Sequence, residues 1–339
     1  MKIAINFATN TSGGGRYHVN KFLLSIDDSS FANLYFIFNH CHRDLGIEEN
    51  CIYVDSPARS FRAKRQIKLF LKHHCIDVIY TMAGPSYCSF DIPHILGLSN
   101  AWILRENKLL LRHFFRGRTF LYEHLRIQWQ RLNVSRSASM YVFQSQESER
   151  AHISDFPFME GKTALVPNAL AAEAKVQNTS CTFDVLVPGT YYPHKGVEEI
   201  YQYAVNLPYR DFTFTLHDDS WQVLIKRYGE YAHIKNIGRY APENEILICG
   251  GSNVVILNSY IETISGTALS AAFAGTKVVA RNINANKSIF GDSIPYYDSV
   301  VELELILNSN MSIPVSKYPL VSYRKRVTEI LDIILKCVE

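Results

Sequence analysis

The sequence predicts an α/β protein built from two doubly wound domains, each a parallel sheet with helices on both faces. Short apolar segments alternate with helical segments almost throughout the chain, which is the pattern typical of parallel sheets. The alternation pauses once, over residues 169–182, which are rich in small and polar side chains, and then resumes. The length of 339 residues is also more than twice that of a typical domain, which favours two domains or one large α/β unit.

The first run of alternation occupies residues 1–170 and the second residues 171–315. In the first, strands are expected at 2–8, 34–38, 77–81, 94–98, 140–143 and 164–166, and helices at 16–26, 61–74, 104–115, 118–133 and 146–153. In the second, strands are expected at 183–187, 212–216, 234–237, 254–257 and 277–280, and helices at 196–205, 221–231, 243–249 and 266–274. A last helix, 318–338, lies in a C-terminal segment, 316–339, that is expected to pack near the interdomain region.

Composition and cysteine usage favour a cytoplasmic globular protein. Hydrophobic residues make up 47% of the chain and charged residues 20%, which excludes a disordered protein. No apolar run approaches the roughly 20 residues of a membrane span, and no signal-peptide pattern opens the chain. The seven cysteines are scattered without a Cys-x-x-Cys pair, which argues for reduced thiols and against a zinc ribbon.

The net charge of +3 hides a difference between the two halves. Residues 1–170 carry 20 basic and 14 acidic side chains, whereas residues 171–339 carry 15 basic and 18 acidic ones. The basic side chains concentrate at 59–72 and 105–136. Such stretches are either solvated helix faces or surfaces that attract an anionic partner, namely membrane lipid or nucleic acid. The acidic second half and the lack of a recognition motif argue against nucleic acid.

Three loops that follow predicted strands have features of phosphate sites. In a doubly wound sheet, ligands bind beyond the carboxyl ends of the strands. Gly13, Gly14 and Gly15 precede Arg16 at the start of a helix, where unpaired amides can hold an anion. They do not complete the Gly-x-Gly-x-x-Gly fingerprint, so a dinucleotide cofactor is not expected. The second loop, 188–196, carries Lys195 at a helix N-terminus, where a cation is unfavourable unless an anion is its partner.

The third loop follows the strand expected at 254–257 and holds a single acid, Glu262. Ser265 or Thr267 is expected to cap the helix at 266–274, whose side chains are nearly all small or apolar. A buried helix N-terminus attracts an anion, and a diphosphate fits. An ordinary loop in which Glu262 only caps a neighbouring group is the alternative.

In their order and spacing, these segments resemble the GT-B glycosyltransferases of the large retaining family GT4. The segments that carry the resemblance are 13–16, 138–145, 166–168, 188–196, 237–238 and 259–280. The resemblance implies two Rossmann-like domains that face each other across a cleft, an acceptor domain at 1–170 and a donor domain at 171–315. It also implies transfer of a sugar from a nucleotide-diphosphate donor, with retention, in bacterial surface polysaccharide synthesis such as that of O-antigen and lipopolysaccharide.

The resemblance assigns roles position by position. Lys195 matches the lysine that neutralises the diphosphate, and Glu262 matches a glutamate that contacts the donor sugar. Arg16 lies in the loop that approaches the donor from the first domain. Further donor-side positions implied are Gly14, Gly15, Gly189, Thr190, Gly238, Ser265, Gly266, Thr267 and Ser270. Acceptor-side positions implied are Ser99 and Asn100.

Three positions depart from the family pattern. Thr190 stands where arginine is frequent, Ser270 where a second glutamate binds the ribose, and Ser99 or Asn100 where a histidine is common. A serine suits 2′-deoxyribose, which lacks one of the two hydroxyls a carboxylate would hold, so a dTDP-sugar such as dTDP-rhamnose is predicted. A UDP- or GDP-sugar enzyme and a catalytically inactive scaffold are the alternatives.

No cofactor or metal is expected, because no convincing Asp-x-Asp motif occurs and Lys195 with a helix dipole can stabilise the leaving diphosphate. The expected acceptor is a glycan or lipid-linked oligosaccharide. The segment 109–122 mixes cations with aromatic residues, which suits peripheral contact with the inner face of the cytoplasmic membrane. A core helix with one basic face is the alternative for this segment.

Overall fold

The computed structural model describes residues 1–339 except 12, 28–31, 171–181, 310–315 and 339. The chain divides into two compact units, one made of Met1–Ala169 with Tyr323–Glu339 and the other of Leu170–Ser322. Both contain a parallel sheet covered by helices, as the alternation predicts. The expected linker at 169–182 falls mostly on residues outside those the structure describes.

The sheet of the first unit has seven parallel strands in the order β3-β2-β1-β4-β5-β6-β7. The central strand β1 pairs with β2 through Ile3 and Leu34 and with β4 through Ile3 and Val78. The strands are β1 (Ile3–Asn6), β2 (Leu34–Asn39), β3 (Cys51–Val54), β4 (Val78–Thr81), β5 (His94–Gly97), β6 (Met140–Phe143) and β7 (Thr163–Leu165). The inner strands β1, β2, β4 and β5 are buried on both faces and are largely apolar, whereas the edge strands β3 and β7 are only partly buried.

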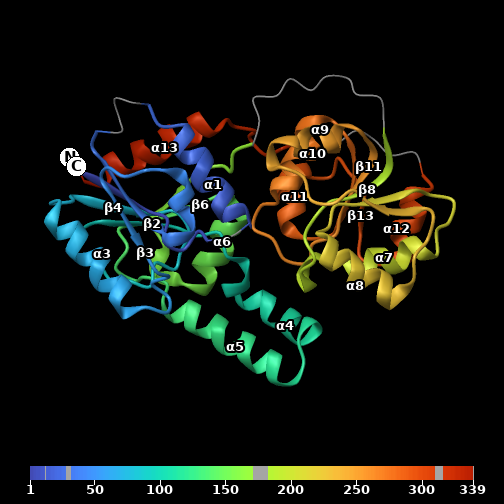
Figure 1. Ribbon diagram of the computed structural model, residues 1–339, viewed down its shortest axis with the longest axis horizontal. Helices are drawn as coiled ribbons and strands as arrows, with labels where there is room; N and C mark the ends of the chain where they lie inside the picture. Colours follow the sequence, from blue (N-terminus) through green and yellow to red (C-terminus); the bar gives the residue numbers. More distant parts are fainter. Residues whose placement is uncertain (12, 28–31, 171–181, 310–315, 339) are drawn as a thin grey trace. The chain divides into compact units, whose positions relative to one another are not determined.

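Helices cover both faces of this sheet (Figure 1). Its helices are α1 (Gly13–Leu24), α3 (Phe61–His73), α4 (Lys108–Phe114), α5 (Gly117–Leu132), α6 (Gln146–Asp155) and α13 (Tyr323–Lys336). Phe22 of α1 and Ile330 of α13 pack in one core cluster with the strand residue Phe36. Ile67 of α3 packs in a second cluster with Ile37. Since side chains alternate along a strand, neighbouring residues of β2 serve opposite faces.

The helix expected at 318–338 begins at Tyr323 and belongs to the first unit. Arg326 is 7% exposed and donates to the Pro167 carbonyl at 3.0 Å and to Asn168 Oδ1 at 2.6 Å. The hydroxyl of Tyr323 bonds His18 Nδ1. Burial, aided by the charge of Arg326, lowers the pKa of His18 to about 3, so this imidazole is neutral at physiological pH.

The sheet of the second unit has six parallel strands in the order β10-β9-β8-β11-β12-β13. The strands are β8 (Phe183–Val187), β9 (Phe212–Phe214), β10 (Ile234–Asn236), β11 (Ser252–Leu257), β12 (Lys277–Arg281) and β13 (Tyr296–Tyr297). The helices are α7 (Val197–Val205), α8 (Asp218–Tyr228), α9 (Glu245–Gly250), α10 (Gly266–Ala274), α11 (Asn284–Phe290) and α12 (Val300–Leu307). The central pair β8 and β11 brings together the two loops in which a phosphate site is predicted.

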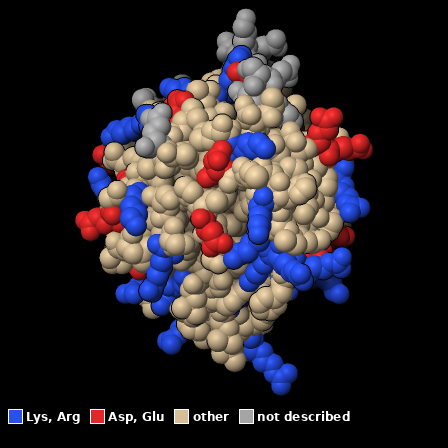
Figure 2. Space-filling view, turned by 90° about the vertical axis from the view of Figure 1, so that its left-hand side faces the viewer, with Lys and Arg blue, Asp and Glu red and all other residues tan. Residues whose placement is uncertain are grey.

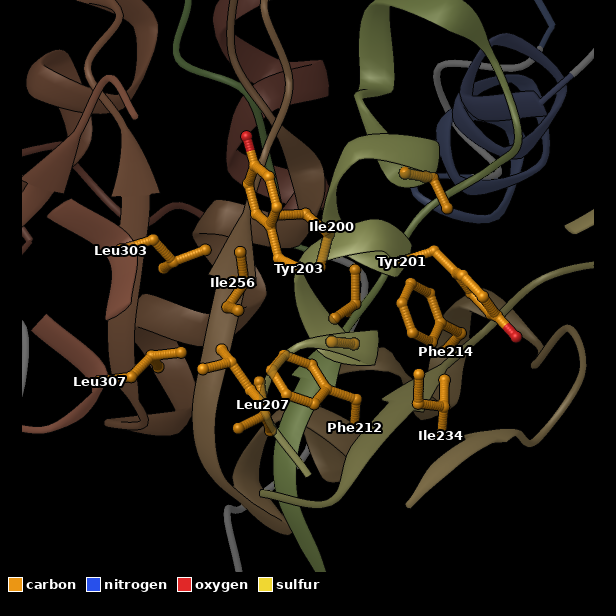
Figure 3. Packing of buried hydrophobic residues seen from close by; sticks show 14 of the residues in the cluster. Ile200, Tyr201, Tyr203, Leu207, Phe212, Phe214, Ile234, Ile256, Leu303 and Leu307 are labelled. Atoms are coloured by element: carbon orange, nitrogen blue, oxygen red, sulfur yellow. The ribbon is translucent and has the colours of Figure 1, made fainter. Parts of the chain in front are cut away.

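The helices of the second unit also cover both faces of its sheet. On one face, Ile200 of α7 and Leu303 of α12 pack with Phe212 and Ile256 of the strands (Figure 3). On the other, the small side chains of α10 pack with residues of β11 and β12, including Ala268 against a cluster that contains Val255. This buried position explains why the side chains of α10 are nearly all small or apolar.

Several elements were not predicted from the sequence. The strands β3 and β13 and the helices α11 and α12 fall in stretches for which no element was expected. The strand β13 is only two residues long, and β3 is only partly buried, so neither has a strong apolar pattern. Among the described residues, no helix is sufficiently long and apolar to span a bilayer.

Candidate functional site

The loop between β8 and α7 ends in a single 3-10 turn, Pro193–Lys195, closed by Gly196. Gly196 has φ +60°, a left-handed conformation that favours glycine. A Cβ at this position would lie 2.3 Å from Asn258 Nδ2 and 2.9 Å from the Asn258 carbonyl oxygen. Only glycine therefore allows the Lys195 turn to approach the end of β11 so closely.

The loop between β11 and α10 lies beside this turn. Its final residue, Ser265, is the N-cap of α10, and its hydroxyl accepts a hydrogen bond from the Ala268 amide at 3.3 Å. Gly266 and Thr267 form the first turn, where a helix supplies no acceptor for its own amides. The amide of Tyr260 in the same loop donates to the His194 carbonyl at 2.8 Å, so the backbones of the two loops are joined.

Lys195 and Glu262 form an ion pair across these loops. Their side chains are 25% and 15% exposed, so both charges are largely withdrawn from water. The sequence predicts a role for both residues without predicting their contact. In the protein without ligand, the anionic partner of the Lys195 ammonium is therefore the Glu262 carboxylate, and the predicted bound anion stays a prediction.

A small pocket lies at the carboxyl ends of β8 and β11, where ligands bind in sheets of this kind. Lys195 is the one charged residue among the described residues that line it. The lining residues are Val187, Pro188, Gly189, Lys195, Val197, Ile256, Leu257, Asn258, Ser259, Ser265, Thr267 and Asn286.

His194 precedes Lys195 and stays neutral. Burial, with a smaller effect of the Lys195 charge, lowers the pKa of His194 to about 4, although Glu262 opposes the shift. The ring of His194 stacks on that of Tyr192, with centroids 5.8 Å apart. At physiological pH the turn therefore presents one positive charge, that of Lys195.

Glu245 was not predicted as a site residue. Its carboxylate accepts hydrogen bonds from the hydroxyls of Ser270 at 2.9 Å and Thr267 at 2.8 Å, and from Tyr240 at 3.1 Å. Burial and the Glu245 charge raise the pKa of Tyr240. The Glu245 carboxylate is thus adjacent to Ser270, where the sequence has serine in place of the family's second glutamate and predicts no carboxylate. The Thr-x-x-Ser spacing in α10 was a weak signal, because it puts both hydroxyls on one helix face.

The other donor-side positions lie at different distances from the pocket. Gly189 lines it, and its amide donates to Thr215 Oγ1 at 3.1 Å. Thr190 follows directly, and its carbonyl accepts from the Tyr192 amide. Gly238 follows the edge strand β10, which is separated from β8 by β9. The structure therefore brings Gly189, Lys195 and the α10 N-terminus together but leaves Gly238 outside the pocket lining.

The remaining predicted positions belong to the first unit. Gly14, Gly15 and Arg16 form the first turn of α1, and Arg16 forms an ion pair with Asp44. Ser99 and Asn100 follow β5. Asn100 caps a 3-10 turn by accepting from the Trp102 amide at 3.1 Å, and its amide donates to Gln130 Oε1 at 3.3 Å. Asn100 therefore has a structural role in its own unit.

No protein-family model matches the chain, and no curated sequence is significantly similar to it. Solved structures do share its fold. They include WaaG, a glycosyltransferase involved in lipopolysaccharide biosynthesis (12% identity, TM-score 0.62, covering 99% of this chain and 93% of WaaG). Sucrose-phosphate synthase from Thermosynechococcus elongatus is 14% identical, with a TM-score of 0.60 over 99% of this chain and 97% of the synthase. UDP-GlcNAc 2-epimerase from Methanocaldococcus jannaschii, in complex with UDP-GlcNAc and UDP, is 13% identical, with a TM-score of 0.59 over 98% of this chain and 100% of the epimerase. The predicted GT-B fold, with two Rossmann-like units, is confirmed.

The close approach at Gly196 makes a stability prediction. Gly196→Ala is expected to lower the free energy of unfolding by roughly 1–3 kcal/mol, because the new side chain combines a left-handed backbone with a clash against Asn258. Gly266→Ala is the control, since its Cβ would meet nothing within 4 Å and alanine favours the helix. Chemical denaturation measures both. Equal stability of the two variants would contradict the assigned role of Gly196.

Proposed function

We propose that this chain is a glycosyltransferase that moves a sugar from a nucleoside diphosphate to a glycan or lipid-linked acceptor. The observation that carries the proposal is Lys195, which pairs with Glu262 and lines a pocket of the second unit together with Ser265 and Thr267 at the N-terminus of α10. An ammonium and helix amides at one place fit a diphosphate, and a neighbouring carboxylate fits sugar hydroxyls. Membership in family GT4 and retention of the anomeric configuration are proposed from the sequence resemblance.

The chemistry requires that the leaving diphosphate be stabilised while positive charge develops on the sugar. Lys195 and the amides of Gly266 and Thr267 would supply that stabilisation from fixed positions. Glu262 would orient the hydroxyls of the sugar. The diphosphate would take the place of Glu262 as the partner of Lys195, which frees the carboxylate for this second role. The reaction is proposed to need no metal. The acceptor hydroxyl is proposed to attack the anomeric carbon from the face that the leaving group occupies as the bond to the diphosphate breaks, and its proton passes to the leaving phosphate.

Lys195→Ala is expected to reduce the rate of sugar transfer on the order of 10²-fold, because one preorganised charge that stabilises the leaving group is lost. Lys277→Ala is the matched control, because Lys277 is exposed and lies at the amino end of β12, whereas the pocket lies at the carboxyl ends of the strands. The assay follows release of nucleoside diphosphate in the presence of acceptor. Turnover of Lys195→Ala within twofold of the parent protein would count against the assignment.

The same assay separates sugar transfer from two alternatives for a protein of this fold, an epimerase and an inactive scaffold. An epimerase would convert the donor sugar without releasing the diphosphate. An inactive scaffold would neither release it nor transfer the sugar. Either outcome across a panel of nucleotide sugars would contradict the proposed function.

The nucleoside of the donor is proposed to be deoxythymidine, with dTDP-rhamnose as the first candidate. This proposal rests on Ser270, which can serve the one remaining ribose hydroxyl. Glu245 lies next to Ser270, and its carboxylate could bind both hydroxyls of a ribose instead. The choice between the two nucleosides therefore depends on whether Glu245 stays bonded to Thr267 and Ser270 when the nucleotide binds.

Calorimetric titration with dTDP, UDP and GDP tests this choice. Tighter binding of dTDP is expected. Ser270 can bind one hydroxyl of the sugar, so the second hydroxyl of a ribose would stay unpaired, whereas a 2′-deoxyribose lacks that hydroxyl. Much tighter binding of UDP or GDP would overturn the deoxyribose proposal and assign the ribose to Glu245. Glu245→Gln would then weaken UDP or GDP binding more than dTDP binding.

The first unit is proposed to contact an anionic membrane through α4 and α5. Several large apolar side chains of these helices are exposed, including Leu109 at 79% and Leu121 at 56%. Arg112, Arg116 and Arg118 are exposed between them. On the face drawn in Figure 2, basic side chains outnumber acidic ones over the lower half, and the lowest part of this face is mostly uncharged. Exposed apolar and basic groups together suit the interface of an anionic bilayer, where a lipid-linked acceptor would lie.

Replacing Arg112, Arg116 and Arg118 together by serine is expected to reduce sedimentation with phosphatidylglycerol vesicles at low salt. Each basic side chain near such a surface contributes about 1 kcal/mol, so the partition coefficient should fall roughly 10²-fold. Phosphatidylcholine vesicles should bind neither protein.

The control removes the same number of charges from the second unit, by replacing the exposed lysines Lys226, Lys235 and Lys277 with serine. This variant should sediment as the parent protein does. If both triple variants lost binding equally, net charge alone would explain the attraction and the assigned surface would be wrong.

A further inference from the structure

A buried arginine lies directly behind the candidate site. Arg281 ends β12 and is 5% exposed. Its Nε and Nη2 donate to Asn258 Oδ1 at 3.1 and 2.8 Å, and Nη2 also bonds the carboxylate of Glu199. A buried guanidinium needs such partners, because an unpaired charge away from water is very costly. Neither Arg281 nor Glu199 lines the pocket, and the proposed chemistry uses neither.

This cluster reaches the loop that carries Glu262. The Tyr260 hydroxyl donates to Glu199 Oε2 at 2.8 Å. The guanidinium carbon of Arg281 lies 3.8 Å from the centroid of the Tyr260 ring, a cation–π contact. Tyr260 is thus held both at its hydroxyl and on its ring face, two residues before Glu262. Burial and the bond to Glu199 raise the pKa of Tyr260 to about 12, which keeps its hydroxyl a donor.

The same cluster reaches the turn that carries Lys195. Asn258, whose Oδ1 accepts from Arg281, donates through Nδ2 to the Gly196 carbonyl at 2.5 Å. The Tyr260 amide donates to the His194 carbonyl. The backbone is therefore fastened on both sides of Lys195, at residues 194 and 196. Each of these bonds leads back to Arg281 through Asn258 or Tyr260.

We propose that Arg281 is a positioning residue for the donor site. Together with Glu199, it holds Asn258 and Tyr260, and through them it fixes the loops of Lys195 and Glu262 relative to each other. The inference rests on the proposed function, in which a fixed Lys195 stabilises the leaving diphosphate. A charge stabilises a transition state best when the protein already holds it in place, so a loosened turn lowers the rate even with Lys195 present.

The test compares two variants of similar chemistry in the second unit. Glu199→Gln/Arg281→Met removes the pair formed by the buried Arg281 and the partly exposed Glu199 without leaving an unpaired charge. Asp184→Asn/Arg210→Met, the matched control, removes an ion pair with an N–O distance of 2.9 Å. Asp184 lies near the start of β8 and Arg210 just before β9, so this pair is at the amino ends of the strands. Arg281→Lys keeps the charge but loses the forked geometry.

The rate of transfer gives the first result. Glu199→Gln/Arg281→Met should lower kcat roughly 10²-fold, the effect of a small misplacement of a catalytic group, while the KM for the donor changes less. In a Lys195→Ala background, the same pair of changes should lower kcat by only about threefold or less. The effects of mutations on the rate are not additive when the residues act through one group. Arg281→Lys should recover part of the lost rate, and the Asp184–Arg210 control should keep that of the parent. Additive losses, or an equal loss in the control, would overturn the proposal.

Hydrogen exchange of the protein without ligand gives a result that does not depend on activity. The amides of Lys195, Gly196 and Tyr260 are all hydrogen bonded and should exchange faster in Glu199→Gln/Arg281→Met than in the control. Unchanged protection there would overturn the positioning role, even in an active enzyme. If the parent protein neither transferred sugar nor bound nucleotide, the proposed function would fail, and exchange would still decide whether Arg281 fixes these loops.

Discussion

The ion pair between Lys195 and Glu262 joins residues 67 positions apart in the chain at the carboxyl edge of one parallel sheet. Parallel strands make this possible, because each successive βα loop of the sheet emerges at the same edge. The two loops involved follow β8 and β11, which are neighbours in the sheet although three helices and two strands separate them in sequence. Without that pairing of strands, neither the pocket nor its charge would exist.

The pair also explains how a lysine is tolerated beside helix N-termini. The amide dipoles of α7 and α10 make this edge of the sheet positive, so a cation there needs a nearby anion. Glu262 provides it in the free protein, and a diphosphate carries more negative charge with which to replace it. Behind this pair, the buried Arg281 forms a second ion pair with Glu199, which balances its charge. The positive potential of the pocket is thereby left to Lys195 and the amides of α10.

Much of this arrangement could be predicted from the sequence, because it depends on local patterns. Apolar runs and helix caps indicate where strands end and helices begin; Lys195 and Ser265 lie just before helices, and Glu262 lies in the loop between β11 and α10. Glu245 and Arg281 could not be predicted in the same way. Glu245 begins an ordinary partly exposed helix, and its bonds to Thr267 and Ser270 arise only from the packing of α9 on α10. Arg281 ends an apolar strand, and the partners that justify its burial are Asn258, directly after β11, and Glu199 of α7.

The most direct test of the central claim is a crystal structure of the protein with a bound nucleoside diphosphate. The account predicts that the diphosphate contacts Lys195 Nζ and the amides at the start of α10, and that Glu262 no longer bonds Lys195. A nucleotide bound elsewhere, with the Lys195–Glu262 pair intact, would contradict it.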